Sequence, residues 1–188
     1  MNVHVLTTTA SPGMPVQGMG ATKSLSIAIR TAHAGEAVQI NALIQAHLEE
    51  GHLLPRQLGE LESHLPRFVV AAADDRVVAC AELSPLSGTV AEVRSLVVHR
   101  DARHGGLGHQ LVNELMRRAR ASGFHTLCAF THGPGYFVGM GFSIVPHQWV
   151  REKIVADCQT CPLFRTCGQH AVVLSLNARG TGGRPARS

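Results

Sequence analysis

The chain has 188 residues, 45% hydrophobic and 16% charged, a balance typical of a folded domain and not of a disordered chain. The net charge is +4, but aromatic residues make up only 4% and the densest basic segment, Arg117 to Arg120, falls within an amphipathic helix pattern, which argues against nucleic-acid binding. The longest apolar run, near 68–73, is far shorter than the roughly 20 residues that cross a bilayer. Because residues 1–17 also lack the features of a secretion signal, we expect a cytoplasmic protein that binds neither nucleic acid nor a membrane.

Three segments are expected along the chain. Residues 1–25 carry Thr, Gly, Pro and Met without periodicity and predict a flexible leader. Residues 178–188 form a Gly/Arg-rich tail without an apolar side chain large enough to anchor it. Residues 26–177 between them predict one domain.

Hydrophobic periodicity predicts the elements of this domain. In chain order they are a strand at 27–29, helices at 37–48 and 58–65, strands at 68–73, 77–83 and 89–98, a helix that opens at 105–108 and stops at Gly123, a strand at 126–130, a short helix at 136–140, and strands at 142–145 and 171–176. Asp74-Asp75 indicates a hairpin turn between two of the strands. This order predicts an α/β (α+β) fold with a mixed sheet, not a sandwich or a bundle.

A glycine-rich turn joins the strand that ends in Leu96-Val97-Val98 to the following helix. The turn reads Arg103-His104-Gly105-Gly106-Leu107-Gly108-His109. Its glycines let backbone N–H groups face a ligand unobstructed, and the helix start adds free N–H groups and a positive dipole end. The pattern predicts a pyrophosphate cradle, with an ordinary turn as the alternative. It is neither a P-loop nor a dinucleotide fingerprint, because His109-Gln110 and Leu111 stand where those motifs need other residues.

The pattern Arg103-x-x-Gly106-x-Gly108 resembles the acetyl-CoA signature of the GNAT superfamily of N-acetyltransferases. Tyr136-Phe137-x-x-Met140-Gly141-Phe142 is similar to that family's short helix and Gly-Phe turn. The resemblance implies the GNAT fold, with a mixed central sheet flanked by helices, and acetyl-CoA as co-substrate. It further implies that backbone groups of Leu96, Val97 and Val98 pair with the pantetheine arm. The pyrophosphate would lie against Arg103, His104, Gly105, Gly106, Leu107, Gly108 and His109.

Three separated segments are similar to the short N-acetylglutamate synthases. They are Gly51-His52-Leu53-Leu54-Pro55-Arg56 with Glu60-Leu61, then Ala91-Glu92-Val93-Arg94-Ser95-Leu96, and the stretch Lys153-Ile154-x-x-Asp157-Cys158-x-x-Cys161-Pro162-x-Phe164-x-x-Cys167. The resemblance implies acetyl transfer to the α-amine of L-glutamate, the entry to arginine biosynthesis. The arginine-feedback domain of the larger synthases is expected to be absent. The alternatives are another acceptor (glutamine, another small molecule or a protein amine) or a non-catalytic acyl-CoA-binding or metal-sensing module.

The acceptor side is expected to contain Glu92, Arg94 and Arg56. Glu92 and Arg94 are two apart on a strand and share one face, and the resemblance supports Glu92 as the general base. A structural ion pair is the alternative. Glutamate carries two carboxylates, so Arg56 and Arg94 are the candidate substrate-binding residues, with a surface side chain as the alternative for Arg56.

Tyr136 is the candidate general acid. Many GNAT enzymes place a tyrosine beside the thiolate at the position that Phe137 occupies here. Tyr136 lies one residue earlier, about 100° away around a helix. A packing role for Tyr136, with water protonating the thiolate, is the alternative.

The chain has five cysteines, and some of them could bind a metal ion. Cys158, Cys161, Cys167 and His170 could form a zinc site, but we favour reduced thiols over zinc or a disulfide. Cys80 and Cys128 lie within apolar strands and are expected in the core. GNAT domains often pair, so a homodimer is one expectation.

Overall fold

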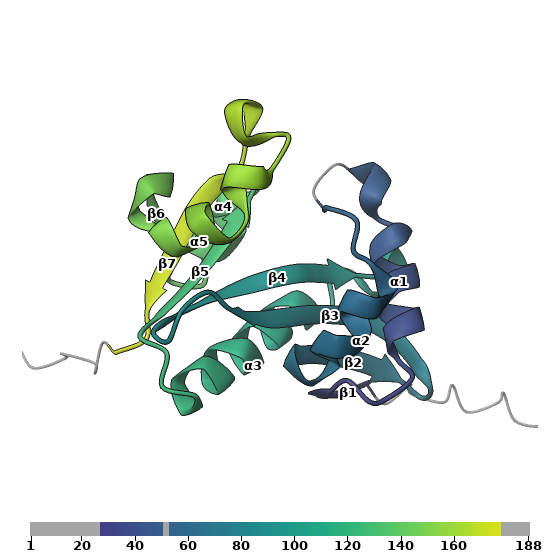
Figure 1. Cartoon of the computed structure of the whole chain (residues 1–188). Helices are drawn as coiled ribbons and strands as arrows, with labels where there is room; N and C mark the ends of the chain where they lie inside the picture. The colour runs from purple at the N-terminus through teal and green to yellow at the C-terminus, as the bar shows by residue number, and fades with distance from the viewer. Residues whose placement is uncertain (1–26, 51–52, 178–188) are drawn as a thin grey trace, which may run out of the picture.

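A computed structural model describes residues 27–50 and 53–177, and its strands form one seven-stranded sheet (Figure 1). The expected leader and tail, and the motif residues Gly51 and His52, lie outside the described residues. The spatial order of the strands is β1-β2-β3-β4-β5-β7-β6. The strands are β1 (Ile27–Thr31), β2 (Phe68–Ala73), β3 (Arg76–Pro85), β4 (Val90–Val98), β5 (Thr126–Thr131), β6 (Ser143–Val145) and β7 (His170–Ser175).

Five helices accompany the sheet in the described ranges: α1 (Ala37–Gln45), α2 (Leu58–His64), α3 (Leu107–Ala121), α4 (Pro134–Val138) and α5 (Arg151–Ala156). The elements predicted from periodicity are present, and the mixed α/β sheet is confirmed. The prediction missed α5, and it extended the first helix to residue 48, where the structure ends α1 at Gln45 and continues with a separate turn at Leu48–Glu50. None of the helices in the two described ranges is long and apolar enough to cross a membrane.

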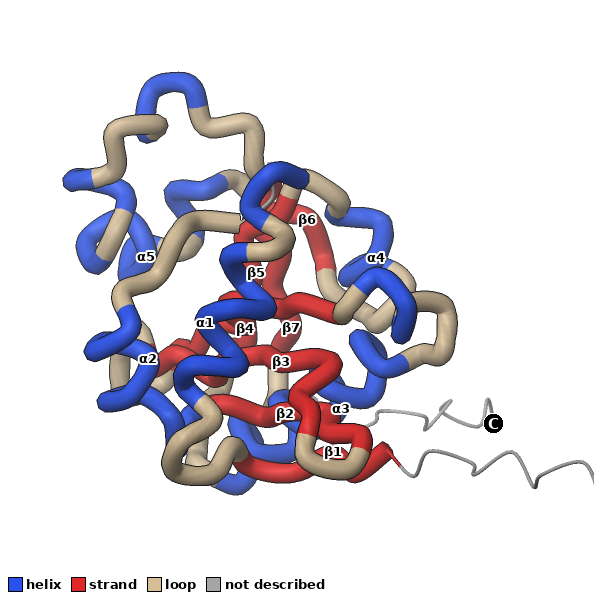
Figure 2. The backbone as a smooth tube through the Cα atoms, turned by 90° about the vertical axis from the view of Figure 1, so that its right-hand side faces the viewer, coloured by secondary structure: helices blue, strands red, loops and turns tan. Residues whose placement is uncertain are grey.

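Helices cover both faces of the sheet, with α3 on one side and α1 and α2 on the other (Figures 1 and 2). The side chains of strand β2 explain why both faces of the sheet are covered. Its Val69 and Ala71 pack in the cluster that contains α3, whereas Phe68 and Val70 pack with α1 and α2. Because alternate side chains of a strand point to opposite faces, an uninterrupted apolar strand requires cover on both sides.

The pairing of β4 with β5 is the only parallel one in this sheet, and it is short. It runs from Val90 opposite Thr126 to Glu92 opposite Cys128. Beyond Glu92 the described strands are no longer paired, so their backbones separate towards the carboxyl end of each strand. Side chains and backbone groups of both strands are thereby exposed to the space between them.

Candidate active site

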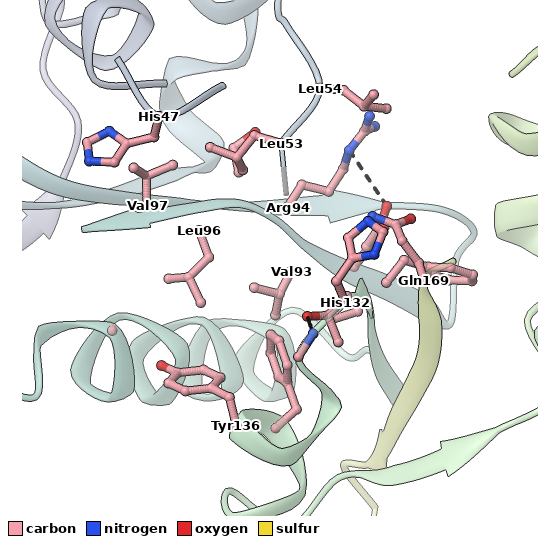
Figure 3. A pocket seen from close by; sticks show the side chains of 18 of the residues that line it. His47, Leu53, Leu54, Val93, Arg94, Leu96, Val97, His132, Tyr136 and Gln169 are labelled. Atoms are coloured by element: carbon pink, nitrogen blue, oxygen red, sulfur yellow. Dashed lines mark hydrogen bonds and ion pairs between the residues drawn. The ribbon is translucent and has the colours of Figure 1, made fainter. Parts of the chain in front are cut away.

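A cavity of about 550 Å³ lies where β4 and β5 separate (Figure 3). Strand β4 contributes Glu92 to Val98, and β5 with the turn after it contributes Ala129 to Gly133. Figure 3 shows Val93 and Leu96 extending from β4 towards Tyr136. The other described residues that line it are His47, Glu50, Leu53, Leu54, Arg56, Arg103, Gly108, Tyr136, Phe137, Lys153 and Gln169.

A bulge in β4 shapes the middle of this wall. Between the pairs Cys80–Val97 and Glu82–Arg94, β4 has one more residue than β3. Ser95 has a φ of 48°, in the left-handed region that a non-glycine residue rarely adopts. A bulge interrupts ladder pairing and redirects the strand, so backbone groups near Leu96 become available to a ligand.

Glu92 lies at the centre of a charged cluster at one end of the cavity. Glu92 is 3% exposed, and Lys153 Nζ lies 2.8 Å from each oxygen of the Glu92 carboxylate. Arg94 Nε lies 3.7 Å from Glu92 Oε2, so the two side chains lie on one side of the strand as their spacing predicted. Burial raises the pKa of Glu92 above the usual range of a carboxyl, and the Lys153 and Arg94 cations oppose that rise.

Asp157 contacts both Lys153 and Arg94, although it is not among the residues that line the cavity. Its Oδ2 accepts from Lys153 Nζ at 2.6 Å and lies 3.5 Å from Arg94 Nη1. Burial opposes ionisation of Asp157, but Lys153 and Arg94 together keep its pKa below the ordinary value. Lys153 and Asp157 fall within the segment that is similar to the synthases, but the sequence indicated no role for either residue. Their i,i+4 spacing was the available signal.

Arg56 lines the cavity but is bound by the protein itself. The residue is 7% exposed, so it is not a surface side chain. Its guanidinium donates to Glu60 on α2 at 2.7 Å and 3.0 Å, to Glu82 on β3 at 2.9 Å, and to the hydroxyl of Ser95 at the bulge at 2.8 Å. Arg56 therefore links α2 to the sheet at the point where β4 bulges.

Tyr136 lies against the start of α3, and its hydroxyl has no hydrogen-bond partner within the described chain. A Cβ atom built on Gly108 would lie 2.8 Å from Tyr136 Oη, so glycine is needed there for the ring to approach the helix. Burial raises the pKa of Tyr136 to about 12, and the hydroxyl therefore retains its proton at neutral pH. Phe137 is 5% exposed and packs against Phe142 in the core.

The glycine-rich turn lies beside the same cavity. Five of the residues predicted to bind acetyl-CoA line the cavity: Leu96, Val97, Val98, Arg103 and Gly108. The other five are not among its lining residues: His104, Gly105, Gly106, Leu107 and His109. Gly106 has a φ of 73° and begins α3 without a capping side chain. The Arg103 guanidinium lies 2.9 Å and 2.8 Å from the carboxylate oxygens of Glu50, a contact that the sequence did not indicate.

The alternative zinc site is not assembled. Within the two described ranges, no three His, Cys, Asp or Glu side chains are grouped so that they could hold a metal ion. Cys158 and Cys161 are partly buried, and Cys167 is exposed. Cys80 and Cys128 are buried, as expected.

Residues 38–135 match the Acetyltransferase (GNAT) family. This chain belongs to that family. Its GNAT fold, its acetyltransferase class and acetyl-CoA as its co-substrate, all expected from the resemblance to that family, are thereby confirmed.

Amino-acid acetyltransferases are among the relatives of this GNAT chain. The enzyme so named from Neisseria meningitidis is 32% identical over 159 residues, which cover 84% of this chain and 35% of the relative. An uncharacterized N-acetyltransferase of Chlorobaculum tepidum is 28% identical over 148 residues, 79% of this chain and 96% of that protein. The chain therefore spans about a third of the first relative and nearly all of the second.

A solved structure of N-acetylglutamate synthase from Neisseria gonorrhoeae superposes on this GNAT chain with a TM-score of 0.72 and 29% identity. It was determined in complex with coenzyme A and N-acetyl-glutamate, and the similar region covers 82% of this chain and 36% of that one. Three features of the site fit a long ligand with a phosphate group and a thioester. They are the Tyr136 hydroxyl without a partner, the start of α3 without a capping side chain, and the space between β4 and β5.

Proposed function

We propose that this GNAT enzyme transfers the acetyl group of acetyl-CoA to the α-amine of L-glutamate. The observation that carries the proposal is the buried carboxylate of Glu92, in the wall of the cavity and flanked by Arg94 and Lys153. A carboxylate accepts the proton that an ammonium must lose, and cations attract an acidic acceptor. The named activity of the Neisseria relatives, and the N-acetyl-glutamate in the gonococcal complex, support the same acceptor.

Acetyl-CoA, the acetyl donor, would lie between β4 and β5 with its phosphates at the start of α3. Backbone groups of Leu96, Val97 and Val98 beyond the bulge are the proposed partners of the pantetheine amides. The N–H groups of the turn from Arg103 to His109 are the proposed partners of the pyrophosphate. Since Arg103 is paired with Glu50, its guanidinium exchanges one anionic partner for another when it contacts a phosphate.

The transfer would proceed by direct attack. Glu92 takes one proton from the acceptor ammonium, directly or through a water molecule, and the freed amine attacks the thioester carbonyl. Backbone N–H groups near the β4 bulge stabilise the oxyanion. The carbon–sulfur bond then breaks, and Tyr136 donates its hydroxyl proton to the departing thiolate. The attacking nitrogen loses its second proton to water as the amide forms. A proton from water restores the Tyr136 hydroxyl, and Glu92 releases its proton to solvent. The products are the N-acetyl amino acid and coenzyme A.

Glutamine is a second candidate acceptor, because each cation of the cluster already has an anionic partner. Arg56 contacts Glu60 and Glu82, while Lys153 and Arg94 both contact Asp157. An acceptor without a side-chain carboxylate therefore meets less repulsion from these carboxylates than glutamate does.

A panel of acceptors tests the proposed function. Thiol release from acetyl-CoA is measured with glutamate, glutamine, other amino acids, kanamycin and a peptide amine. We expect the highest kcat/KM with glutamate. A higher value with glutamine would replace the acceptor but retain the site. Binding of acetyl-CoA without turnover on any amine would contradict the enzymatic proposal for this chain and favour an acyl-CoA-binding module.

Tyr136→Phe is expected to lower kcat towards the lower end of the roughly 10²–10⁴-fold that general acid catalysis contributes. Stability should hardly change, because the removed hydroxyl is buried without a partner and the ring contacts remain. Thermal unfolding and steady-state kinetics, with Phe137→Leu as a control for packing in α4, separate the two roles. A kcat equal to that of the unmodified enzyme would assign Tyr136 to packing alone.

A further inference from the structure

We propose that Lys153 is the positioning residue for Glu92, fixing the orientation and the charge of the base, and that Asp157 in turn orients Lys153. This inference rests on the proposed function, because it takes Glu92 to be the group that accepts the proton. It adds a role for α5, an element that hydrophobic periodicity did not predict.

The ammonium group of Lys153 lies between two carboxylates, those of Glu92 and Asp157. Nζ lies 2.8 Å from Oε1 of Glu92, 2.8 Å from Oε2 of Glu92 and 2.6 Å from Oδ2 of Asp157. Two of these contacts are hydrogen bonds, to Oε2 of Glu92 and Oδ2 of Asp157, and the approach to Oε1 completes the ion pair with Glu92. Nζ also lies 5.5 Å from the centroid of the Phe130 ring. Lysine is seldom buried unless it is paired, and here the residue is 9% exposed.

The two-oxygen contact fixes the plane of the Glu92 carboxylate without blocking it. An ionised carboxylate has about four lone-pair sites, and the hydrogen bond from Lys153 to Oε2 occupies one of them. Because Glu92 lines the cavity, a lone pair on the cavity side would accept from an acceptor amine or a bridging water. Lys153 lies on α5, 61 residues after Glu92 in the chain, so an element outside the sheet holds the carboxylate in this orientation.

The charges around Glu92 decide whether it is ionised. Burial raises its pKa, Lys153 and Arg94 lower it, and Asp157 raises it again. The neighbours on the adjoining strands carry no charge at neutral pH, since burial raises the pKa of the Cys128 thiol on β5 and the residue opposite on β3 is Ser84. Lys153 is thus the closest cation to the base, and its loss shifts the balance towards the protonated acid, which cannot accept a proton.

The test is the pH dependence of kcat/KM for Lys153→Met, measured with one acceptor for all variants so that titration of the acceptor is common to them. We expect the acid limb to move upward by about one pH unit, which corresponds to about a tenfold loss of activity on that limb, with recovery at alkaline pH. Lys153→Arg should restore the limb. Arg151→Met, which removes an exposed cation from the same helix, should leave it unchanged.

Asp157→Asn provides a second variant with the opposite sign. Removal of the Asp157 charge stabilises ionised Glu92, so the acid limb should move to lower pH. If Lys153→Met does not fold, an unmoved acid limb in Asp157→Asn would still contradict the proposal that the charges of this cluster set the ionisation of Glu92. A purely structural role of Lys153 would lower activity at every pH without moving the limb.

The failure of this inference can be distinguished from failure of the proposed function. An unchanged acid limb in both variants, alongside an inactive Glu92→Gln, would overturn the role of Lys153 and leave Glu92 as the base. Near-normal turnover of Glu92→Gln would instead overturn the base assignment itself, and the role of Lys153 with it.

Discussion

Glu92→Gln should lower turnover by about 10²–10⁴-fold at neutral pH while the protein still folds and binds acetyl-CoA. The amide keeps the shape of the side chain and can still accept a hydrogen bond from Lys153, which retains Asp157 as its second partner. What the amide cannot do is accept a proton from the acceptor ammonium. The expected loss therefore appears in kcat and in kcat/KM together, with little change in acetyl-CoA affinity.

The pH profile of the unmodified enzyme adds a sign to this prediction. A general base works only while it is ionised, and burial raises the pKa of Glu92. Activity should therefore begin to fall at a higher pH than an exposed glutamate would impose. Glu62→Gln, a matched change at an exposed position on α2, should have neither effect. Near-normal turnover of Glu92→Gln would exclude Glu92 as the base.

The sheet and its flanking helices were predictable because their apolar residues recur with clear periods. On the apolar stripe of α3, Leu111, Leu115 and Ala119 are fully buried. Helix α5 escaped prediction for the converse reason. It spans six residues, and its Val155 is 69% exposed, so no buried stripe marks it in the sequence.

Local spacing predicted the parts of the site that are local in the chain. Glu92 and Arg94 lie together because alternate residues of a strand share a face. Lys153 meets Glu92 only because α5 packs beside the diverging strands, a tertiary relation that no local pattern encodes. The Arg56 environment is of the same kind, since Glu60 is four residues away in the chain but Glu82 and Ser95 come from the sheet.

Arg56→Ala is expected to destabilise the fold by roughly 3–5 kcal/mol, the usual cost of leaving one member of a buried ion pair without its partner. Glu82 is fully buried, and Arg56 Nη1 lies 2.9 Å from it. His64 lies 3.1 Å from the other oxygen of Glu82 and is a weaker substitute, because it carries a charge only when protonated. The thermal midpoint should fall by on the order of 10 °C. Arg67→Ala, at an exposed arginine nearby, should leave it almost unchanged.

This stability loss changes how the predicted acceptor-binding role of Arg56 must be measured. In Arg56→Ala a higher acceptor KM would not be informative, because loss of the contact to Ser95 also disturbs the β4 bulge. Arg56→Lys keeps a cation beside Glu82 but removes the paired N–H groups that bind a carboxylate in two places. If Arg56 binds the acceptor, this variant should raise the acceptor KM several-fold with kcat little changed, and its thermal midpoint should stay above that of Arg56→Ala. If Arg56 only links α2 to the sheet, the acceptor KM should stay constant in Arg56→Lys. The structural role has its own test: a thermal midpoint of Arg56→Ala within about 2 °C of the unmodified protein would contradict it.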